Sequence, residues 1–390
     1  MAKSANIEQN IARMKPNEFL DTFTPLFANC KAGTELPAIM IWGPPGVSKS
    51  ACVNQLAERV GKLTNKQTFV HDVRLININP IDLRGIPSKV TITQKIKKPV
   101  KSGDKIIYKQ IDEQVDVARW LRPEIFQMDD SDDVINFLFL DEITAAPQSV
   151  QAAAYQLTLD RKVGEHKLPD NVFVLCCGNR ISDRAIASKL STALANRLLH
   201  IEFYPDIDDW KKWALNNNID MRIVGFLNWK PELLFKFDPT SDDIAFPTPR
   251  TWEMASNILK KVKDIKIAQA LIAGCVGIGT AIEFSGYAKV YHALPNVDSI
   301  FEGKNIEYPT KMDIAYALSS SLVNRANKAT KKQLDNMIKW LIGWRTDYAI
   351  LTVKDCIKSD RLMDMFAQSD IWVDWYVKNK DIVSSYGGMS

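Results

Sequence analysis

The sequence predicts an α/β domain built on a parallel sheet, followed by a second half that is helical throughout. Short, unbroken apolar runs alternate with helix-like stretches through the first half, which is typical of a parallel sheet buried on both faces. The alternation stops at Tyr204-Pro205-Asp206, and from Trp210 onward the apolar residues recur at helical spacing. One sheet is therefore expected, and it belongs to the first half.

The apolar pattern also predicts where the elements lie. Five apolar runs predict strands over residues 38–42, 69–75, 137–140, 172–176 and 199–203. Helical spacing predicts helices over residues 50–60, 149–158, 219–229, 249–262, 267–278, 312–324 and 332–344. Near the C-terminus lie five aromatic residues that helical spacing places in the core, with a docking surface as the alternative: Trp340, Trp344, Trp372, Trp375 and Tyr376.

Length and composition indicate a globular protein of two or three domains. The chain has 390 residues, of which 46% are hydrophobic and 25% charged. No run of about 18 apolar residues could span a bilayer. The N-terminus has no apolar signal-peptide core, so we expect a cytoplasmic protein without a membrane partner. The cysteines are scattered and the histidines share no ligand spacing, which predicts reduced thiols and no zinc site.

The most informative segment, residues 43–50, directly follows the first apolar run and has the sequence GPPGVSKS. In a phosphate-binding loop, Gly, four variable residues, Gly, Lys and Ser or Thr curl backbone amides around a polyphosphate, and the last two side chains reach its outer oxygens and Mg²⁺. Ser48 stands where the pattern has its second Gly, so a turn without a ligand is the alternative. The residues expected to contact the nucleotide are Gly43, Pro44, Pro45, Gly46, Val47, Ser48, Lys49, Ser50 and Ala51.

Two later strands end on polar side chains. The run at 137–140 closes on Asp141 and Glu142. In a nucleotide hydrolase the first carboxylate holds Mg²⁺ and the second polarises the attacking water, so Ser50 and Asp141 are the expected metal ligands. The run at 172–176 leads to Asn179, whose amide would orient that water or contact the γ-phosphate. Taken alone, such an Asn more often forms a turn.

With these motifs in this order, the chain resembles the AAA+ ATPases, and within them the MoxR-like branch. The resemblance covers about residues 35–292, with residues 43–50 similar to Walker A, residues 137–142 to Walker B and Asn179 to sensor 1. The finer resemblance lies in residues 79–87, 150–157, 160–164, 178–180, 183–185 and 246–253. It implies an ATPase that binds ATP and Mg²⁺ on an AAA+ core.

The resemblance also implies roles for arginines. Arg197 lies where the family carries an arginine finger, a cation that enters the neighbouring subunit's site and neutralises transition-state charge. Arg180 and Arg184 compete for that role. Arg250 matches sensor 2, which would reach the γ-phosphate of its own subunit. The alternative for Arg197 and Arg250 is a surface arginine paired with a carboxylate.

The domain organisation follows from the same resemblance: an N-terminal helical segment (1–34), the AAA+ nucleotide-binding domain (35–205), a helical lid (206–293) and a helical C-terminal extension (294–390). A hairpin at about 89–117 interrupts the α/β pattern and matches the family's helix-2 insert. Seven lysines between Lys89 and Lys109 would face the channel of a ring and a negatively charged client. A solvated surface is the alternative.

The expected function is that of an ATP-driven remodelling motor, assembled as a hexameric ring. It would act on a protein client, and the family suggests a von Willebrand factor A-domain partner. A nucleic-acid-stimulated helicase or loader that uses the hairpin lysines is the alternative. A low-turnover assembly factor gated by nucleotide is the third reading. Ser48 is expected to weaken affinity or slow turnover, because its Cβ occupies the place of a glycine.

Overall fold

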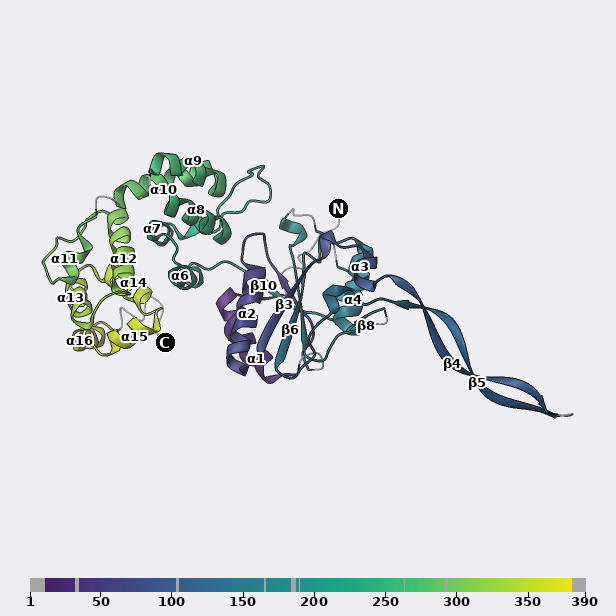
Figure 1. The fold of residues 1–390 in the computed structure, drawn as a ribbon. Helices are drawn as coiled ribbons and strands as arrows, with labels where there is room; N and C mark the ends of the chain where they lie inside the picture. The colour runs from purple at the N-terminus through teal and green to yellow at the C-terminus, as the bar shows by residue number, and fades with distance from the viewer. Residues whose placement is uncertain are drawn as a thin grey trace. The chain divides into compact units, whose positions relative to one another are not determined.

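The computed structural model describes residues 11–31, 35–102, 105–164, 166–183, 187–188, 190–262, 264–291 and 294–380. The chain divides into two compact units. The α/β unit runs up to Pro45 and from Lys49 to Phe203, and the helical unit runs from Tyr204 and takes in residues 46–48. Figure 1 shows both units and labels many of their helices and strands. The predicted fold class, a P-loop-type parallel α/β sheet followed by helices, is confirmed.

The α/β unit is built on a six-stranded parallel sheet with the order β1-β10-β2-β9-β6-β3. Its strands are β1 (Ala12–Met14), β2 (Ile39–Trp42), β3 (Gln67–Arg74), β6 (Val134–Asp141), β9 (Val172–Gly178) and β10 (Leu199–Phe203). Its helices are α1 (Pro16–Asn29), α2 (Lys49–Thr64), α3 (Pro80–Arg84), α4 (Gln148–Leu159) and α5 (Thr192–Ala195). A small hairpin pairs β7 (Lys162–Val163) with β8 (His166–Lys167).

All five predicted strands are present in the sheet, which contains one further strand that was not predicted. The short strands β7 and β8 were not predicted either. β1 adds an edge strand beside β10 within the segment that the sequence indicated as helical only. Three residues, Ala-Arg-Met, are too few to show an alternating pattern, so this strand depends on its neighbour. The N-terminal segment therefore belongs to the sheet as well as to α1.

Helices cover the sheet on both faces, because consecutive residues of its central strands are apolar and point to opposite faces. Leu138 and Leu140 of β6 pack in one apolar cluster with the buried face of α4. Phe137 points to the other side, where Phe27 of α1 lies edge-on to Phe173 of β9 at a centroid distance of 4.3 Å. Every residue of β6 is buried, which explains its continuous apolar sequence.

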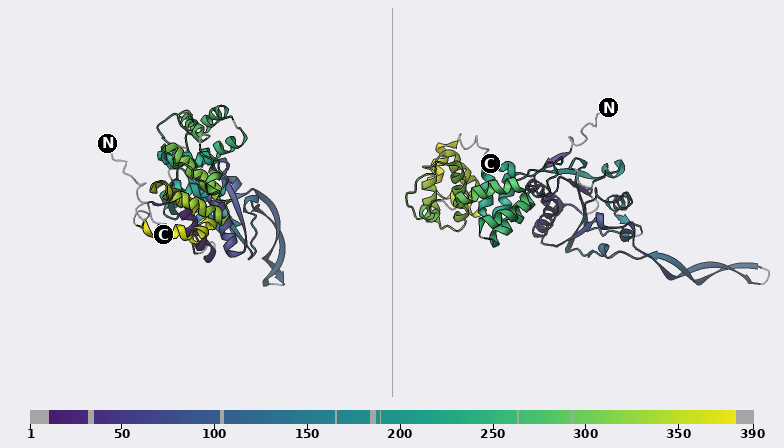
Figure 2. Two further views of the ribbon diagram at one scale, coloured as in Figure 1. Left: turned by 90° about the vertical axis from the view of Figure 1, so that its left-hand side faces the viewer. Right: turned by 90° about the horizontal axis from the view of Figure 1, so that it is seen from above.

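A long antiparallel hairpin leaves the sheet between α3 and β6. It consists of β4 (Pro87–Ser102) and β5 (Lys105–Trp120), with Pro87 opposite Trp120 and Ser102 opposite Lys105. Figure 1 and Figure 2 show the two strands twisting around each other beyond the α/β unit. The paired strands extend the expected insert of 89–117 by two residues at one end and three at the other.

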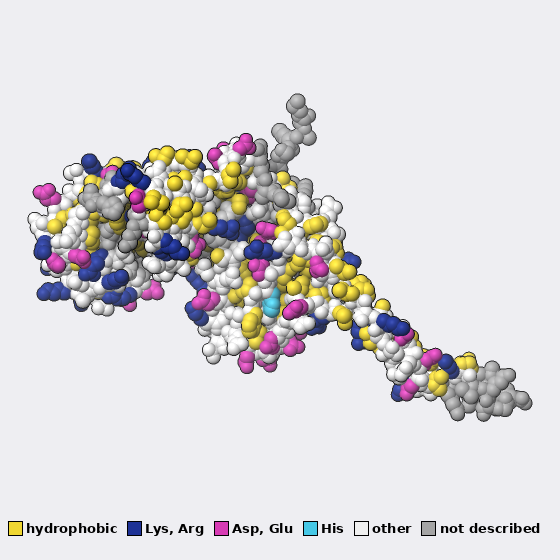
Figure 3. Space-filling model, turned by 45° about the horizontal axis from the view of Figure 1, so that its top comes forward, with side chains coloured by type: hydrophobic (Ala, Val, Ile, Leu, Met, Phe, Trp, Pro, Cys, Tyr) yellow, Lys and Arg dark blue, Asp and Glu magenta, His cyan; other side chains and the backbone are white. Residues whose placement is uncertain are grey.

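The charges of the hairpin are mixed along its described part. Lys89 forms an ion pair with Asp116 at 2.8 Å, and Lys98 forms one with Glu113 at 3.1 Å. Figure 3 shows basic side chains (dark blue) and acidic side chains (magenta) along the hairpin. Acidic residues of β5 thus partner two of the seven lysines that the sequence analysis assigned to a client.

The helical unit contains two apolar cores. Phe226, Trp252 and Phe284 lie at the centre of the first. Trp340, Trp344 and Trp372 are buried in the second, as their spacing predicted, whereas Trp375 and Tyr376 are only partly buried against it. The helices are α6 (Ile207–Asn216), α7 (Met221–Trp229), α8 (Pro249–Lys261), α9 (Ile265–Val276), α10 (Ile278–Tyr291), α11 (Val297–Phe301), α12 (Met312–Ala326), α13 (Lys331–Leu341), α14 (Thr346–Cys356), α15 (Asp360–Ala367) and α16 (Asp370–Lys378).

Helix α12 joins the two cores. It packs against α7 and α10 on one side and against α14 on the other. Its Ala317 belongs to the first core and the adjacent Leu318 to the second. The described residues from 204 onward lie in one compact unit. The division into a helical lid (206–293) and a helical C-terminal extension (294–390) stays a prediction.

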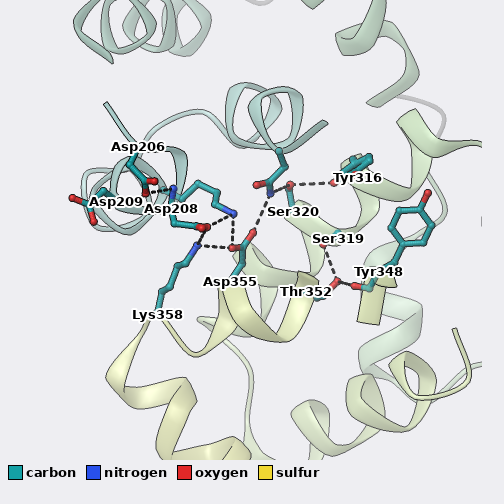
Figure 4. Close-up of polar contacts among 12 residues, drawn as sticks. Asp206, Asp208, Asp209, Tyr316, Ser319, Ser320, Tyr348, Thr352, Asp355 and Lys358 are labelled. Carbon is teal, nitrogen blue, oxygen red and sulfur yellow. Dashed lines mark hydrogen bonds and ion pairs between the residues drawn. The ribbon is translucent and has the colours of Figure 1, made fainter. Parts of the chain in front are cut away.

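A cluster of four charges, in which Lys211 and Asp355 are buried and Asp208 is exposed, ties α6 to α14 (Figure 4). Lys211 Nζ lies 2.8 Å from Asp355 Oδ1 and 3.1 Å from Asp208 Oδ1. Lys358 Nζ lies 2.8 Å from Asp355 Oδ1 and 2.9 Å from Asp208 Oδ1. Burial alone would raise the pKa of Asp355, but the two ammonium groups outweigh it and hold the pKa below its usual range.

Replacing Lys211 by Met should lower the free energy of unfolding by about 3 kcal/mol, because a buried carboxylate loses a partner. Lys211 and Asp355 are only 4% and 3% exposed, so water cannot substitute. Tryptophan fluorescence during urea unfolding measures the change, since most tryptophans lie after residue 204.

Lys212→Met is the matched control, because Lys212 is exposed on the same helix and its loss should cost under about 0.5 kcal/mol. The double variant Lys211→Met/Asp355→Leu should be more stable than Lys211→Met alone. Equal midpoints for Lys211→Met and Lys212→Met would contradict the role given to the cluster.

Candidate functional site

The candidate phosphate-binding loop joins the end of β2 to α2, which begins at Lys49. Gly46 and Ser48 have left-handed backbone, with φ of 83° and 67°. Glycine adopts such a φ freely, whereas a residue with a Cβ does so at a cost of about 1–2 kcal/mol. The loop therefore turns as the motif requires, although serine occupies the position of the second glycine.

The Lys49 ammonium lies between this loop and β9. Its Nζ donates to the carbonyl oxygens of Gly43 at 2.6 Å and Pro44 at 3.0 Å, and to Asn179 Oδ1 at 2.9 Å. Lys49 and Asn179 meet because β2 and β9 are neighbours in the sheet, with Trp42 opposite Gly178. The sheet thus brings together the predicted phosphate-binding lysine and the predicted sensor amide.

Asp141 ends β6 at the same edge, and its two carboxylate oxygens have different partners. Oδ2 lies 3.2 Å from the Ser50 hydroxyl, which donates to it. Oδ1 accepts from the backbone N–H of Glu142 at 2.8 Å and from the Cys177 thiol at 2.6 Å. Asp141 is buried, while Glu142 beside it is exposed and has a left-handed φ of 56°. The structure thus places Ser50 beside Asp141, the two residues predicted as metal ligands, and leaves the Glu142 side chain facing outward.

This donor set fits Mg²⁺. A hydroxyl and a carboxylate oxygen are hard ligands, and Mg²⁺ in phosphate sites takes one or two such protein ligands together with phosphate oxygens and water. Within the described ranges, no group of three or more His, Cys, Asp or Glu side chains is placed to hold a metal ion. Ser50 and Asp141 would therefore hold the cation jointly with the phosphates of a nucleotide.

Sequence reasoning missed two side chains near Asp141. Burial and then the Asp141 charge raise the pKa of the Cys177 thiol well above its ordinary value, so the sulfur keeps its proton. The pKa of Asp72 on β3 is also raised, first by partial burial and then by Asp141. A cysteine inside an apolar run gives no polar signal, so Cys177 could only be found from its contact.

Gly178, at the end of β9, lies against the turn that follows β6. A Cβ at Gly178 would lie 2.6 Å from the Thr144 side chain in that turn. Real Cβ contacts are not that short, so a larger residue at position 178 would displace Thr144.

Arg197 lies near the amino ends of the strands, at the side of the sheet opposite to the carboxyl ends that carry the loop and Asp141. Leu199, where β10 begins, is opposite Ile39, where β2 begins. Arg197 lines an open pocket with Ala38 and Phe173, at the start of β2 and β9, and its guanidinium stacks 4.7 Å from the centroid of the Tyr155 ring. The loop begins only at the other end of β2, roughly 13 Å away at 3.3 Å per residue.

The other predicted arginines differ in their surroundings. Arg180 is paired within its own chain, to Asp183 at 2.8 Å and Glu202 at 2.7 Å. Arg184 lies outside the described residues. Arg250 is exposed in the first turn of α8, in the helical unit, and its role as a sensor stays a prediction.

Comparison with known proteins was made by sequence and by structure. No family model matches the chain, and no curated protein matches its sequence. Among solved structures, the chain is similar to C. elegans PCH-2, with 12% identity and a TM-score of 0.33 over 71% of this chain and 69% of that one. A mutant of RuvB from Thermotoga maritima gives 13% identity and a TM-score of 0.32 over 82% and 84% of the two chains.

No described helix is long and apolar enough to cross a membrane.

Replacing Ser48 by Gly should raise the free energy of unfolding by about 1 kcal/mol, because glycine adopts a φ of 67° without the clash of a Cβ. The midpoint of thermal unfolding measures the gain. Ser48→Ala is the control, since it keeps the Cβ and removes only the hydroxyl. If the Gly and Ala variants unfold at the same temperature, the loop is not strained at this residue.

Proposed function

We propose that this protein is an ATP-hydrolysing motor of the AAA+ class, similar to the MoxR-like branch, that works as a ring on a protein client. One observation carries the proposal: five residues with separate predicted roles in ATP hydrolysis lie at one edge of the sheet. These residues are Lys49, Ser50, Asp141, Glu142 and Asn179.

The loop and Lys49 would bind the phosphates. The first amides of α2 have no partner inside the helix and favour an anion at this end. The Lys49 ammonium donates hydrogen bonds to a carbonyl oxygen of the loop and to Asn179 Oδ1. When a nucleotide binds, it would donate instead to oxygens of the β- and γ-phosphates. A phosphate contact is stronger than a carbonyl contact because both partners are charged.

Glu142 and Asn179 would act on the attacking water. Glu142 is exposed beside the buried Asp141, so its carboxylate can accept a proton or a hydrogen bond from water in front of the γ-phosphate. Asn179 lies next to Lys49, where its amide can orient the same water. Mg²⁺, held by Ser50 and Asp141, supplies neutralisation of the phosphate charge when bound.

Arg197 would serve the neighbouring subunit. It lies at the edge of the sheet opposite its own loop, so the group that it neutralises must come from another copy. Arg180 is less suited to this role, because Asp183 and Glu202 already neutralise its charge. A contact between unlike edges of two copies repeats around a ring, and we propose a hexamer with Arg250 as sensor 2.

The client is proposed to be a protein, with a von Willebrand factor A-domain partner as the family suggests. A nucleic-acid motor is the second candidate, since the lysines cluster on the hairpin. It is less favoured because Asp116 and Glu113 pair with Lys89 and Lys98. Single-stranded DNA or RNA that stimulated hydrolysis, with binding that weakens steeply as salt rises, would favour this second candidate. An assembly factor would instead change mass with ATP while hydrolysing little.

Glu142→Gln should bind ATP and hydrolyse it at least tenfold more slowly, because an amide cannot accept the proton of the attacking water. Phosphate release and nucleotide titration measure the two properties separately. Asp130→Asn is the matched control, since Asp130 is an exposed carboxylate before the other end of β6. Equal turnover of Glu142→Gln and the wild type would contradict the role of Glu142 in activating the attacking water.

Arg197→Ala subunits should regain hydrolysis when mixed with Lys49→Ala subunits. The first kind has an intact loop and the second supplies the missing arginine, which in related chemistry contributes about 10³-fold or more to the rate. Mixing Arg197→Ala with the double variant Lys49→Ala/Arg197→Ala should restore nothing. Absence of complementation in the first mixture argues against a role for Arg197 between subunits.

A further inference from the structure

Cys177 contacts the candidate metal ligand from inside the sheet. It is the penultimate residue of β9 and is 1% exposed. Its Sγ lies 2.6 Å from Asp141 Oδ1, on the neighbouring strand. A carboxylate has no proton to give, so the thiol is the donor. A buried donor that bonds a buried acceptor constrains where the acceptor points, because neither group has water as an alternative partner.

The contact sets the orientation of the Asp141 carboxylate. Two donors, the Cys177 thiol and the Glu142 N–H, both approach Oδ1. Rotation of the carboxylate would break both hydrogen bonds, and the thiol would have no water to replace its partner. Oδ2 is thereby kept toward Ser50, at 3.2 Å from its hydroxyl.

We infer that Cys177 is a positioning residue for the divalent cation: it holds Oδ1 of Asp141 so that Oδ2 and Ser50 face the cation together. The inference rests on the proposed nucleotide site and goes beyond it, because it assigns a function to a side chain that binds neither nucleotide nor metal. Groups behind a metal ligand commonly change metal affinity by 10- to 100-fold when they are removed.

The adjacent cysteine provides a matched control. Side chains alternate along a strand, so Cys176 points to the opposite face from Cys177. There it is fully buried in the apolar cluster beneath α4. Cys176→Val and Cys177→Val therefore make the same change in side-chain volume on the same strand. Only Cys177→Val removes the donor to Asp141.

The test measures metal affinity without requiring hydrolysis. Full-length protein is titrated with a fluorescent ADP at a series of Mg²⁺ concentrations and in EDTA. For Cys177→Val we expect a rise of about tenfold in the Mg²⁺ concentration that gives half the metal-dependent gain in ADP affinity. ADP affinity in EDTA should stay within twofold of the wild type. Cys177→Ser should restore the Mg²⁺ dependence, because its hydroxyl also donates, and Cys176→Val should match the wild type.

Several outcomes would overturn the inference. A wild-type Mg²⁺ dependence in Cys177→Val, or an equal loss in Cys177→Ser and Cys176→Val, would mean that the thiol only fills space. Cys177→Ala serves if the Val variant does not fold, since it also lacks the donor. If the wild type itself bound ADP with no effect of Mg²⁺, the proposed metal site would fail, and the role of Cys177 with it. Failure in the variants alone rejects only the role of Cys177.

Discussion

The site depends on one constraint, the parallel pairing of β2, β9 and β6. Because the strands run the same way and stay in register, with Trp42 opposite Gly178 and Leu140 opposite Cys176, their carboxyl ends reach one edge together. The loop and the two polar strand ends then meet. A slip of β9 by one residue would turn Cys177 away from Asp141, since successive side chains face opposite sides.

Strained backbone and a buried charge occur together at the carboxyl ends of these strands. Ser48 and Glu142 both have left-handed backbone despite carrying a Cβ. Asp141 is a buried carboxylate, and partial burial together with the Asp141 charge raises the pKa of Asp72 nearby. Strain and unbalanced charge of this kind persist only where the surroundings determine the conformation. Here the buried strand β6 and the helices on both faces of the sheet provide that support.

The sequence predicted what is encoded locally. The strands, the loop and the pair Asp141-Glu142 follow from apolar runs and short motifs, and each was found at its expected place. The missed features depend on partners far along the chain. Cys177 resembles any buried apolar residue until β9 pairs with β6. Lys211 and Asp355 are 144 residues apart, so no short sequence pattern predicts the ion pair that they form between α6 and α14. β1 is a strand only because β10 offers an edge.

The same parallel pairing separates Arg197 from the loop of its own chain. The phosphate loop follows the carboxyl end of β2, so residues near the amino end of β2 are too far away to contact a nucleotide bound by that loop. Arg197, which precedes β10, lies near this amino end. If both take part in one reaction, two copies must meet through unlike edges of their sheets. Such a head-to-tail contact repeats from copy to copy, and it closes into a ring when the rotation between copies permits. The ring proposal thus follows from strand direction, with the arginine as its chemical reason.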